Sequence, residues 1–273
     1  DTVFGYPGGA VLNIYDALYE YRDRIRHVLT AHEQGAAHAA DGYARSTGKA
    51  GVVIATSGPG ATNLVTGIAT ANMDSIPMVD ITGNVAVELL GRDSFQEVDI
   101  TGITMPVTKH NFAVKRVEDL ADIIRRAFQI AQSGRPGPVL IDVPKDITAS
   151  RCQYERQSPL PLSPSPRPEE SRLAKAAEML RQSKRPFLYA GGGVIASGAA
   201  PELLRFAETL QAPVCTSLMG LGGFPEDHPL SLGMIGMHGS YAAGMALDHS
   251  DLIVVLGARF SDRVAGDREK FGK

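Results

Sequence analysis

The segment Val52-Val53-Ile54-Ala55-Thr56-Ser57-Gly58-Pro59-Gly60-Ala61-Thr62-Asn63 decides the fold of the N-terminal half of the chain. Its four apolar residues predict a buried strand, the glycines and the proline predict a turn, and a helical pattern follows from Asn63 to Ala71. In α/β folds, ligands bind at the carboxyl ends of parallel strands, and glycines there let a ring or a phosphate approach the backbone. Such turns also occur only to reverse the chain, so the segment alone predicts a fold and not a function.

The same alternation of short apolar runs and longer helical patterns continues along the chain. Strands that alternate with helices are typical of parallel sheets with crossover connections. We therefore predict an α/β protein with two doubly wound parallel-sheet domains. The further predicted strands are 77–81, 138–143, 187–190, 214–216 and 252–257, and the further predicted helices are 117–131, 169–182 and 200–210.

A proline-rich segment, Ser158 to Pro168, separates the two halves. Its prolines alternate with small or aliphatic residues, so it can neither pair within a sheet nor continue a helix. This pattern predicts domains at residues 1–155 and 171–273, joined by a linker at 156–170. The chain opens on Asp1 rather than Met and ends soon after the third evident strand of its second half. We therefore expect both ends to be cut and the second domain to be truncated.

The composition excludes several classes of partner. The chain has 273 residues, enough for two hydrophobic cores, and 44% of them are hydrophobic. Its formal charge of −3 gives no basic surface for nucleic acid or anionic lipid. No apolar run reaches the ~20 residues that span a bilayer, so neither nucleic acid nor a membrane is an expected partner. Cys152 and Cys215 lie far apart in the sequence, which favours a reducing compartment over a disulfide framework or a zinc site.

Glu33 is the candidate catalytic acid. Glutamates on amphipathic helices are mostly solvated, but the residues after Glu33 are small, in the runs Gly35-Ala36-Ala37 and Ala39-Ala40. That pattern indicates a helix pressed closely against backbone or a ligand. A carboxylate there would be partly desolvated and available for a strong hydrogen bond to a ring nitrogen. His32 and His38 lack the spacing of a metal-binding pair, and we interpret them as packing or hydrogen-bonding residues.

Seven motifs occur in a fixed order along the chain. They are Phe4-Gly5-Tyr6-Pro7-Gly8-Gly9, His32-Glu33-Gln34-Gly35 through Arg45, Thr56 to Asn63, Gly91-Arg92-Asp93-Ser94-Phe95-Gln96-Glu97, Gly134 to Asp146, Gly236-Met237-His238-Gly239 and Gly257 to Arg263. This order closely resembles the catalytic subunits of acetohydroxyacid synthase (acetolactate synthase), a family of thiamine-diphosphate enzymes of branched-chain amino acid synthesis. The resemblance covers essentially the whole chain. The Phe-Gln-Glu and Pro-Lys-Asp-Ile segments resemble the biosynthetic, FAD-containing branch.

The resemblance implies a thiamine-diphosphate site in the first domain, which corresponds to the pyrimidine-binding domain of these enzymes. In the family, the glutamate that matches Glu33 bonds to N1′ of the aminopyrimidine and favours the imino form, whose nitrogen removes the C2 proton of the thiazolium. Gln96 is implied as a second catalytic residue in the cofactor cleft. The other residues that match contacts of thiamine diphosphate are Tyr6, Pro7, Gly8, Gly9, Pro59 and Asn63.

The resemblance also implies a substrate channel and a flavin site. Phe95 and Lys145 match residues at the channel mouth, and Lys145, the third catalytic residue implied, would offer a cation to the carboxylate of a 2-oxoacid. From the sequence alone, Lys145 is equally compatible with a solvated lysine after a strand. The second domain corresponds to the central FAD-binding domain, in which arginines suit a pyrophosphate. The residues that match flavin contacts are Arg135, Gly191, Gly192, Met237, His238, Gly239, Gly257, Arg259, Asp262 and Arg263.

The reaction implied is decarboxylation of pyruvate and condensation with a second 2-oxoacid, which gives 2-acetolactate or, from 2-oxobutyrate, 2-aceto-2-hydroxybutyrate. The cofactors implied are thiamine diphosphate, FAD and Mg²⁺. Nothing in this chain matches the Gly-Asp-Gly to Asn-Asn segment that holds Mg²⁺ and the diphosphate in the family, so no metal ligand is assigned and the fragment alone is expected to be inactive. The family also implies a cytoplasmic homodimer or tetramer and leaves room for a regulatory small subunit. Import into an organelle stays open because the N-terminus looks cut.

Two other interpretations stay open. One is another thiamine-diphosphate 2-oxoacid enzyme, of the pyruvate oxidase or oxalyl-CoA decarboxylase type. The other is a flavin-binding or assembly module with no chemistry of its own. The chain departs from the family at Asn84-Val85-Ala86, where Gln-Val-Pro is usual. This difference bears on inhibitor sensitivity at the channel mouth more than on catalysis.

Overall fold

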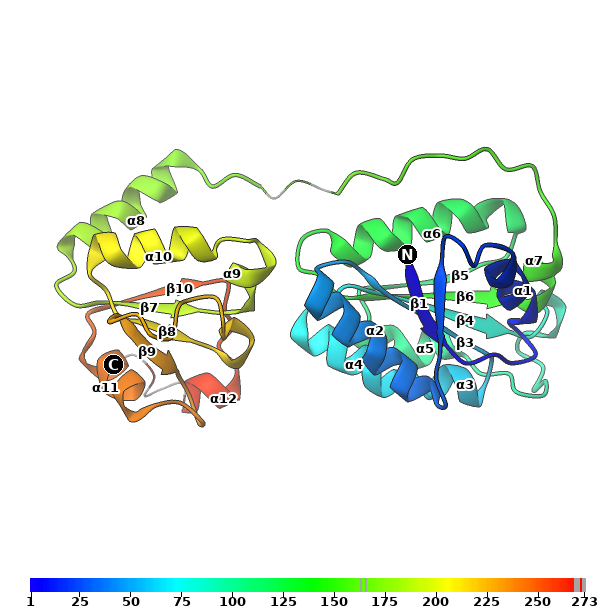
Figure 1. Cartoon of the computed structure of the whole chain (residues 1–273), viewed down its shortest axis with the longest axis horizontal. Helices are drawn as coiled ribbons and strands as arrows, with labels where there is room; N and C mark the ends of the chain where they lie inside the picture. The colour runs from blue at the N-terminus through cyan, green and yellow to red at the C-terminus, as the bar shows by residue number, and fades with distance from the viewer. Residues whose placement is uncertain (163, 165, 268–270, 272–273) are drawn as a thin grey trace. The chain divides into compact units, whose positions relative to one another are not determined.

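The computed structural model describes residues 1–162, 164, 166–267 and 271, and the chain divides into two compact units, Asp1–Ser165 and Pro166–Lys273. In the first unit, parallel strands form a six-stranded sheet in the order β2-β1-β3-β4-β6-β5 (Figure 1). This arrangement confirms the predicted α/β class. The strands are β1 (Thr2–Gly5), β2 (Arg26–Leu29), β3 (Gly51–Ala55), β4 (Met78–Asn84), β5 (His110–Ala113) and β6 (Pro138–Pro144).

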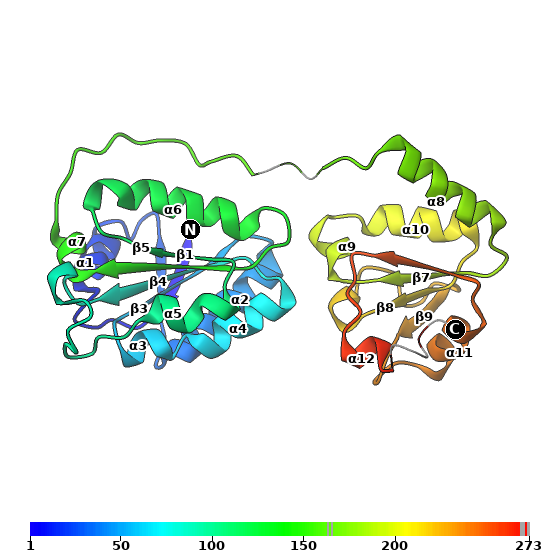
Figure 2. The same cartoon turned by 180° about the vertical axis from the view of Figure 1, so that it is seen from behind.

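Helices cover both faces of this sheet, as Figure 1 and Figure 2 show. The face under α1 and α6 buries apolar residues of five strands, including Val3, Ile54, Val79 and Ile141, against Ala127 and Ala131 of α6. The opposite face packs against α2, α4 and α5. The helices of the unit are α1 (Leu12–Glu20), α2 (Glu33–Thr47), α3 (Pro59–Thr62), α4 (Val65–Asp74), α5 (Ile100–Thr104), α6 (Val117–Gln132) and α7 (Lys145–Ala149), with 3₁₀ turns η1 (Val87–Leu89) and η2 (Met105–Val107).

Small residues let α2 lie close to the sheet and to α4. A Cβ atom at Gly51 would lie 2.2 Å from the carbonyl oxygen of Ala40, and one at Gly67 would lie 2.4 Å from Cβ of Ala37. Both helix ends are capped, because His32 Nδ1 accepts from the amide of Gln34 at 3.1 Å and Gly48 adopts a left-handed φ of 70°. The close packing expected from the small residues after Glu33 is therefore confirmed.

The second unit has a parallel four-stranded sheet in the order β10-β7-β8-β9. One face packs on Leu203 and Ala207 of α10, and the other packs on Ala243 and Leu247 of α11. This unit confirms the prediction of a second parallel α/β sheet. Its elements are α8 (Glu170–Gln182), β7 (Pro186–Ala190), α9 (Gly192–Ala196), α10 (Ala200–Leu210), β8 (Val214–Thr216), η3 (Leu218–Gly220), β9 (Ser231–Met234), α11 (Tyr241–His249), β10 (Leu252–Leu256) and α12 (Asp262–Ala265).

Two details of the predicted secondary structure are wrong. The helix expected from Asn63 to Ala71 begins two residues later, as α4 (Val65–Asp74), and a short helix that was not expected, α3 (Pro59–Thr62), precedes it. Strands β2, β5 and β9 were not expected, and each lies at the edge of its sheet. Of the predicted linker at 156–170, positions 163 and 165 lie outside the described residues, as do positions 268–270, 272 and 273 of the predicted second domain.

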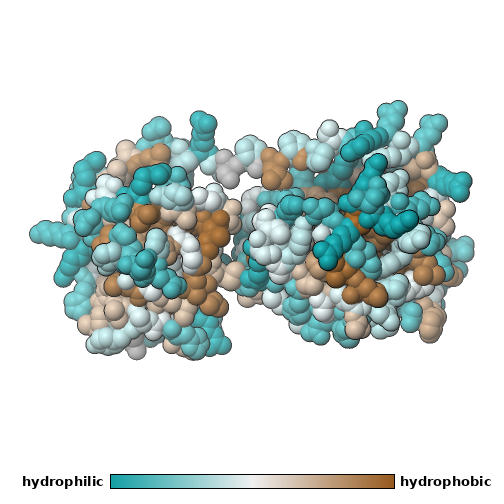
Figure 3. Space-filling model, in the orientation of Figure 1, coloured by the Kyte–Doolittle hydropathy of each residue, from teal (hydrophilic) through white to brown (hydrophobic). Residues whose placement is uncertain are grey.

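On the face shown in Figure 3, hydrophilic residues surround separate apolar patches in both units. Large exposed apolar side chains include Phe95, with 87% of its surface accessible, and Met73 on α4, with 60%. Across the part of the chain that the structure describes, no helix combines the length and the apolar character needed to cross a bilayer.

Candidate functional site

The turn after β3 is the centre of the candidate site, because three other segments pack on it. A Cβ atom at Gly8, in the loop after β1, would lie 2.4 Å from Cβ of Thr56. A Cβ atom at Gly58 would lie 2.6 Å from the carbonyl oxygen of Gln96, and one at Gly60 would lie 3.2 Å from Oε1 of Glu33. Each of these three glycines is needed because a side chain there would meet a neighbouring segment. The turn therefore joins the predicted residues of two loops and of helix α2.

Glu33 lies at the first position of α2 with 9% of its surface exposed. Asn63 donates its side-chain amide to Oε2 of Glu33 at 3.0 Å. The helix N-terminus favours a negative charge at this position. The carboxylate is therefore held at one oxygen by Asn63, while the other oxygen faces Gly60, where the absence of a side chain leaves the approach open. The structure brings together Glu33, Asn63 and the turn that contains Pro59, as the resemblance implies.

Tyr15 on α1 is a second buried polar group near Glu33. Its hydroxyl has no hydrogen-bond partner among the described residues. Burial raises the pKa of Tyr15 above its usual value, and the negative charge of Glu33 raises this pKa further. Sequence reasoning missed this residue, because a tyrosine at an apolar position of a helix resembles an ordinary core residue.

Gln96 lies in a loop whose shape is set by the next residue, Glu97. The carboxylate of Glu97 accepts from the backbone amides of Gly91, Arg92 at 3.3 Å and Ser94 at 3.0 Å. These hydrogen bonds lower the pKa of Glu97, the one from Gly91 most. Gln96 itself adopts a left-handed φ of 57°, which is uncommon outside glycine. The folded loop places the backbone of Gln96 against Gly58, so the predicted proximity of Gln96 to the turn is observed.

A buried polar cluster joins the ends of β4 and β6 at the same edge of the sheet. The carboxylate of Asp142 on β6 accepts from Thr82 Oγ1 at 2.8 Å and from Asn84 Nδ2 at 2.6 Å, both on β4. Burial raises the pKa of Asp142 to about 6, although the hydrogen bonds from Asn84 and Thr82 act in the opposite direction. Sequence reasoning assigned no role to Asp142, because an aspartate in a strand does not reveal its partners on the neighbouring strand.

Several of the predicted residues stand exposed at this edge. Tyr6 is 43% exposed and Pro7 is also exposed, in the loop after β1. Phe95 projects from the loop before α5, and Lys145 begins α7 directly after β6. Because all the strands of the sheet run parallel, the loops after β1, β3, β4 and β6 lie at the same, carboxyl edge. The structure therefore places the predicted thiamine-diphosphate and channel residues along one edge, with no contact recorded between Lys145 and Glu33.

In the second unit, the predicted flavin residues also lie at the carboxyl edge of a sheet. The loops after β7 and β10 touch: a Cβ atom at Gly191 would lie 2.5 Å from the carbonyl oxygen of Gly257. The loop after β9 meets α12, where Met237 donates its amide to the carbonyl of Arg263 at 2.7 Å. The predicted flavin residues that are exposed at this edge are Met237, His238, Gly257, Arg259, Asp262 and Arg263.

Two observations bear on the chemistry of this second edge. The glycines Gly191 and Gly257 are explained by contact between backbones, so they do not by themselves indicate a ligand. The guanidinium groups of Arg259 and Arg263 are exposed, and the hydroxyl of Thr216, at the end of β8, is buried without a hydrogen-bond partner among the described residues. This donor set fits an anionic group such as a pyrophosphate.

Arg135 lies apart from the other predicted flavin residues. It belongs to the first unit, in the loop before β6, and its Nε donates to Ser75 Oγ at 2.7 Å. Ser75 precedes β4. Arg135 therefore lies at the amino edge of the first sheet, opposite the edge that carries Glu33.

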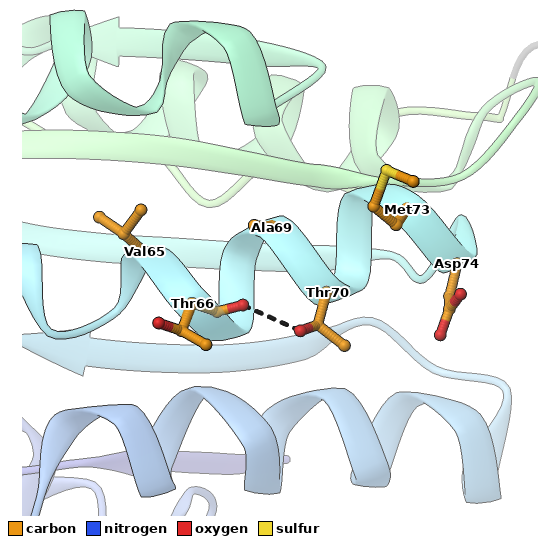
Figure 4. Close-up of a pocket in the computed structure, with 6 residues that line it drawn as sticks. All are labelled: Val65, Thr66, Ala69, Thr70, Met73 and Asp74. Atoms are coloured by element: carbon orange, nitrogen blue, oxygen red, sulfur yellow. Dashed lines mark hydrogen bonds between the residues drawn. The ribbon is translucent and has the colours of Figure 1, made fainter.

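A hollow in the first unit is lined entirely by residues of α4 (Figure 4). Val65, Ala69 and Met73 lie on one side of the helix, and the carboxylate of Asp74 accepts from Arg45 at 2.7 Å. The hollow contains none of the predicted site residues. Its lining residues are Val65, Thr66, Ala69, Thr70, Met73 and Asp74.

Comparison with protein families gives two matches that agree with this geometry. Residues 1–103 match the thiamine pyrophosphate enzyme N-terminal TPP binding domain, and residues 173–273 match the thiamine pyrophosphate enzyme central domain. The fold is similar, with a TM-score of 0.81 and 30% identity, to an X-ray structure described as a thiamin diphosphate-dependent enzyme from Mycobacterium smegmatis. That similarity covers 94% of this chain and 49% of the other.

Curated relatives are more similar in sequence. The acetolactate synthase large subunit of Corynebacterium glutamicum is 54% identical over 99% of this chain, and that of Buchnera aphidicola subsp. Schizaphis graminum is 53% identical over 98%. The chain spans 44% and 48% of these two relatives, which is about half of their length. The chain belongs to the thiamine pyrophosphate enzymes, and its homologues are acetolactate synthase large subunits.

Proposed function

We propose that this chain forms the N-terminal and central parts of an acetolactate synthase. The enzyme would decarboxylate pyruvate and condense it with a second 2-oxoacid, giving 2-acetolactate or 2-aceto-2-hydroxybutyrate for branched-chain amino acid synthesis. One observation carries the proposal: a buried carboxylate, Glu33, is fixed by Asn63 and faces a glycine turn. The names of the relatives support the reaction.

The residues around Glu33 fit the aminopyrimidine of thiamine diphosphate. Gly58 and Gly60 leave space at the turn, and among the described residues no group donates to Glu33 Oε1, while Asn63 donates to Oε2. When bound, thiamine diphosphate supplies the chemistry that breaks the bond between the carboxyl and carbonyl carbons of a 2-oxoacid. Glu33 would hold a proton at N1′ of the aminopyrimidine and so act as the positioned acid of the reaction. Burial strengthens this hydrogen bond because water competes less for the carboxylate.

The other residues of the edge would bind and orient the substrate. Lys145 would attract the carboxylate of an incoming 2-oxoacid, since its ammonium group is exposed at the start of α7. Gln96 would orient bound groups from its place beside Gly58. Phe95, 87% exposed, would form the wall of the channel mouth. Tyr6, Pro7, Gly8 and Gly9 would line the cleft.

We also propose the partners of the complete enzyme. FAD would bind at the carboxyl edge of the second unit, where Arg259 and Arg263 provide donors for its pyrophosphate. Among the described residues, no group of three or more His, Cys, Asp or Glu side chains is arranged to hold a metal ion; Mg²⁺ would be held by residues outside this chain. The enzyme would be a homodimer or tetramer, with a regulatory small subunit as a further partner. The free thiols of Cys152 and Cys215 fit a cytoplasmic location.

Substitution of Glu33 tests this proposal in the full-length enzyme. Glu33→Gln should lower kcat for acetolactate formation by at least about 100-fold, the usual scale for loss of a general acid or base. The variant should also slow exchange of the C2 proton of bound thiamine diphosphate, measured by NMR. His38→Gln, at an exposed position of the same helix, is the matched control and should leave both rates unchanged.

Three results would contradict the proposal. Retention of full activity and of fast C2 exchange in Glu33→Gln would remove Glu33 from the reaction. Hydrogen peroxide or acetyl phosphate as the product would replace the synthase by an oxidase. Flavin binding without any turnover that depends on thiamine diphosphate would favour a binding module.

A further inference from the structure

Asp142 connects two segments of the candidate site through a buried chain of hydrogen bonds. It is 5% exposed, and both of its carboxylate oxygens accept from side chains of β4. Thr82 is its register partner across the two strands, and Asn84 is the last residue of β4. Asp142 also lies three positions before Lys145, the residue proposed to meet the substrate. The cluster of Asp142, Thr82 and Asn84 therefore links the strand that leads to Lys145 with the strand that leads to the loop after β4.

Asn84 links Asp142 to the loop that follows β4. Its Nδ2 donates to Asp142 at 2.6 Å, and its Oδ1 accepts from the amide of Val85 at 2.8 Å. A second tether lies two residues further, where the amide of Val87 donates to Oδ1 of Asp146 on α7 at 3.1 Å. Two aspartates of β6 and α7 therefore fix the first residues of the segment 85–99.

The later part of the same segment contributes residues to the candidate site. It contains Phe95 and Gln96, and the backbone of Gln96 lies against Gly58 of the central turn. The segment is therefore held at its start by Asp142 and Asp146 and in its middle by the turn. A shift at its start would move Gln96 relative to Lys145, because the hydrogen bonds of Glu97 with the amides of Gly91, Arg92 and Ser94 lie within the segment and do not anchor it to the rest of the fold.

We propose that Asp142 is a positioning residue, which through Asn84 holds the segment 85–99 so that Gln96 and Lys145 are presented together to the 2-oxoacid. This inference rests on the proposed function for the identity of the substrate. Removal of one partner would be costly, because the remaining buried group would lose its hydrogen bond. The raised pKa of Asp142 agrees with a carboxylate that water does not reach.

Exchange of the two side chains tests the proposal in the full-length enzyme. Asn84→Asp places two carboxylates in contact, and Asp142→Asn removes the charge that the Asn84 amide meets. Each single variant should raise KM for the 2-oxoacid by about tenfold or more, as expected for loss of a charged hydrogen bond, with kcat changed by less than about threefold. The double variant reverses donor and acceptor: the new amide at position 142 can donate to the new carboxylate at position 84, which still accepts from Val85. It should recover KM to within about threefold of the unmodified enzyme.

Hydrogen exchange of the Val85 amide gives a second readout that needs no turnover. Exchange should be faster in each single variant and should return to the original rate in the double variant. Asn72→Asp on α4 adds the same charge away from the cluster and should change neither KM nor Val85 exchange. If a single variant does not fold, Asn84→Ser removes the amide without adding a charge, and it should raise KM in the same direction.

Unchanged KM and unchanged Val85 exchange in the folded single variants or in Asn84→Ser would overturn the proposal. A double variant as impaired as the singles, with an unfolding temperature equal to that of the unmodified enzyme, would also overturn it. If the unmodified enzyme does not turn over 2-oxoacids, the proposed function fails, and the exchange rates of Val85 still decide whether Asp142 holds the segment.

Discussion

Asp80 is the polar side chain that fits its surroundings least well. It lies in the middle of β4, in register with Val53 on β3 and Leu140 on β6, and none of its surface is exposed. Among the described residues, neither carboxylate oxygen has a hydrogen-bond partner. Burial raises the pKa of Asp80 well above its usual value of 3.8. The carboxyl group therefore destabilises the fold when it is ionised.

The sign of the resulting pH dependence follows from this shift. The folded chain binds the proton of Asp80 more tightly than the unfolded chain does, so the contribution to stability is full below pH 3.8 and is lost as the pH rises through the folded pKa. Asp80→Asn should reduce this fall in stability between pH 5 and pH 8. Asp80→Val also removes the unpaired polar group, and at pH 8 it should raise the free energy of unfolding by about 1–3 kcal/mol. Urea unfolding at both pH values measures this, and a lower stability of Asp80→Val at pH 8 would contradict it.

At the scale of single elements, the apolar pattern predicts the central strands and misses three strands at sheet edges. Strands β3 and β6 are buried along their whole length, and apart from Asp142 they read as continuous apolar runs. Strands β2 and β5, Arg-His-Val-Leu and His-Asn-Phe-Ala, lie at the edges of the first sheet and are half exposed. Strand β9 lies at an edge of the second sheet and contains a glycine. These three edge strands contain fewer apolar residues and so give a weaker signal, whereas β10, at the other edge of the second sheet, reads Leu-Ile-Val-Val-Leu and was predicted.

The same limit applies to the candidate site. The sequence motifs predicted that Glu33, Asn63 and the turn after β3 would lie together, because they belong to elements with clear boundaries. The contacts of Asp142 and Glu97 could not be predicted in this way. The first depends on the register between β4 and β6, and the second depends on a loop in which Gln96 has a positive φ. Whether the predicted residues bind a cofactor stays a prediction.

The turn after β3 requires glycine at position 58, and this requirement can be tested. Gly58 has φ 58° and ψ −119°, a conformation that is costly for other residues, and a side chain there would meet Gln96. Gly58→Ala should lower the free energy of unfolding by about 1–3 kcal/mol and weaken thiamine-diphosphate binding by the full-length enzyme. Gly42→Ala is the matched control, because Gly42 lies inside α2 with no neighbouring atom within 4 Å of its Cβ position. It should raise the stability by about 0.5–1 kcal/mol, since alanine favours a helix. Equal effects of the two substitutions in urea unfolding would refute the role given to the turn.

At the scale of the whole chain, the segment that joins the two units contacts α6 of the first unit. Gln129 on α6 donates its side-chain amide to the carbonyl of Pro161 at 2.7 Å. Tyr154, Gln157, Pro159 and Leu160 line a hollow against the same helix. The proline pattern predicted a linker at 156–170, and no helix or strand is present among the described residues between Ser150 and Glu169. The prolines explain this irregular backbone, while the contacts with α6 depend on tertiary packing that the pattern does not encode.

Separate hydrophobic cores in the two units predict that they unfold independently. Arg151 and Arg156 are exposed in irregular backbone, so trypsin should cleave there first and leave two resistant products, one ending at these residues and one containing the second unit. Calorimetry of the intact chain should then show two transitions. Asp80→Val supplies the control, because Asp80 lies in the first unit and its substitution should move one transition and leave the other in place. A single transition that shifts as a whole in Asp80→Val would show that the units unfold cooperatively, against the independence argued from their separate cores.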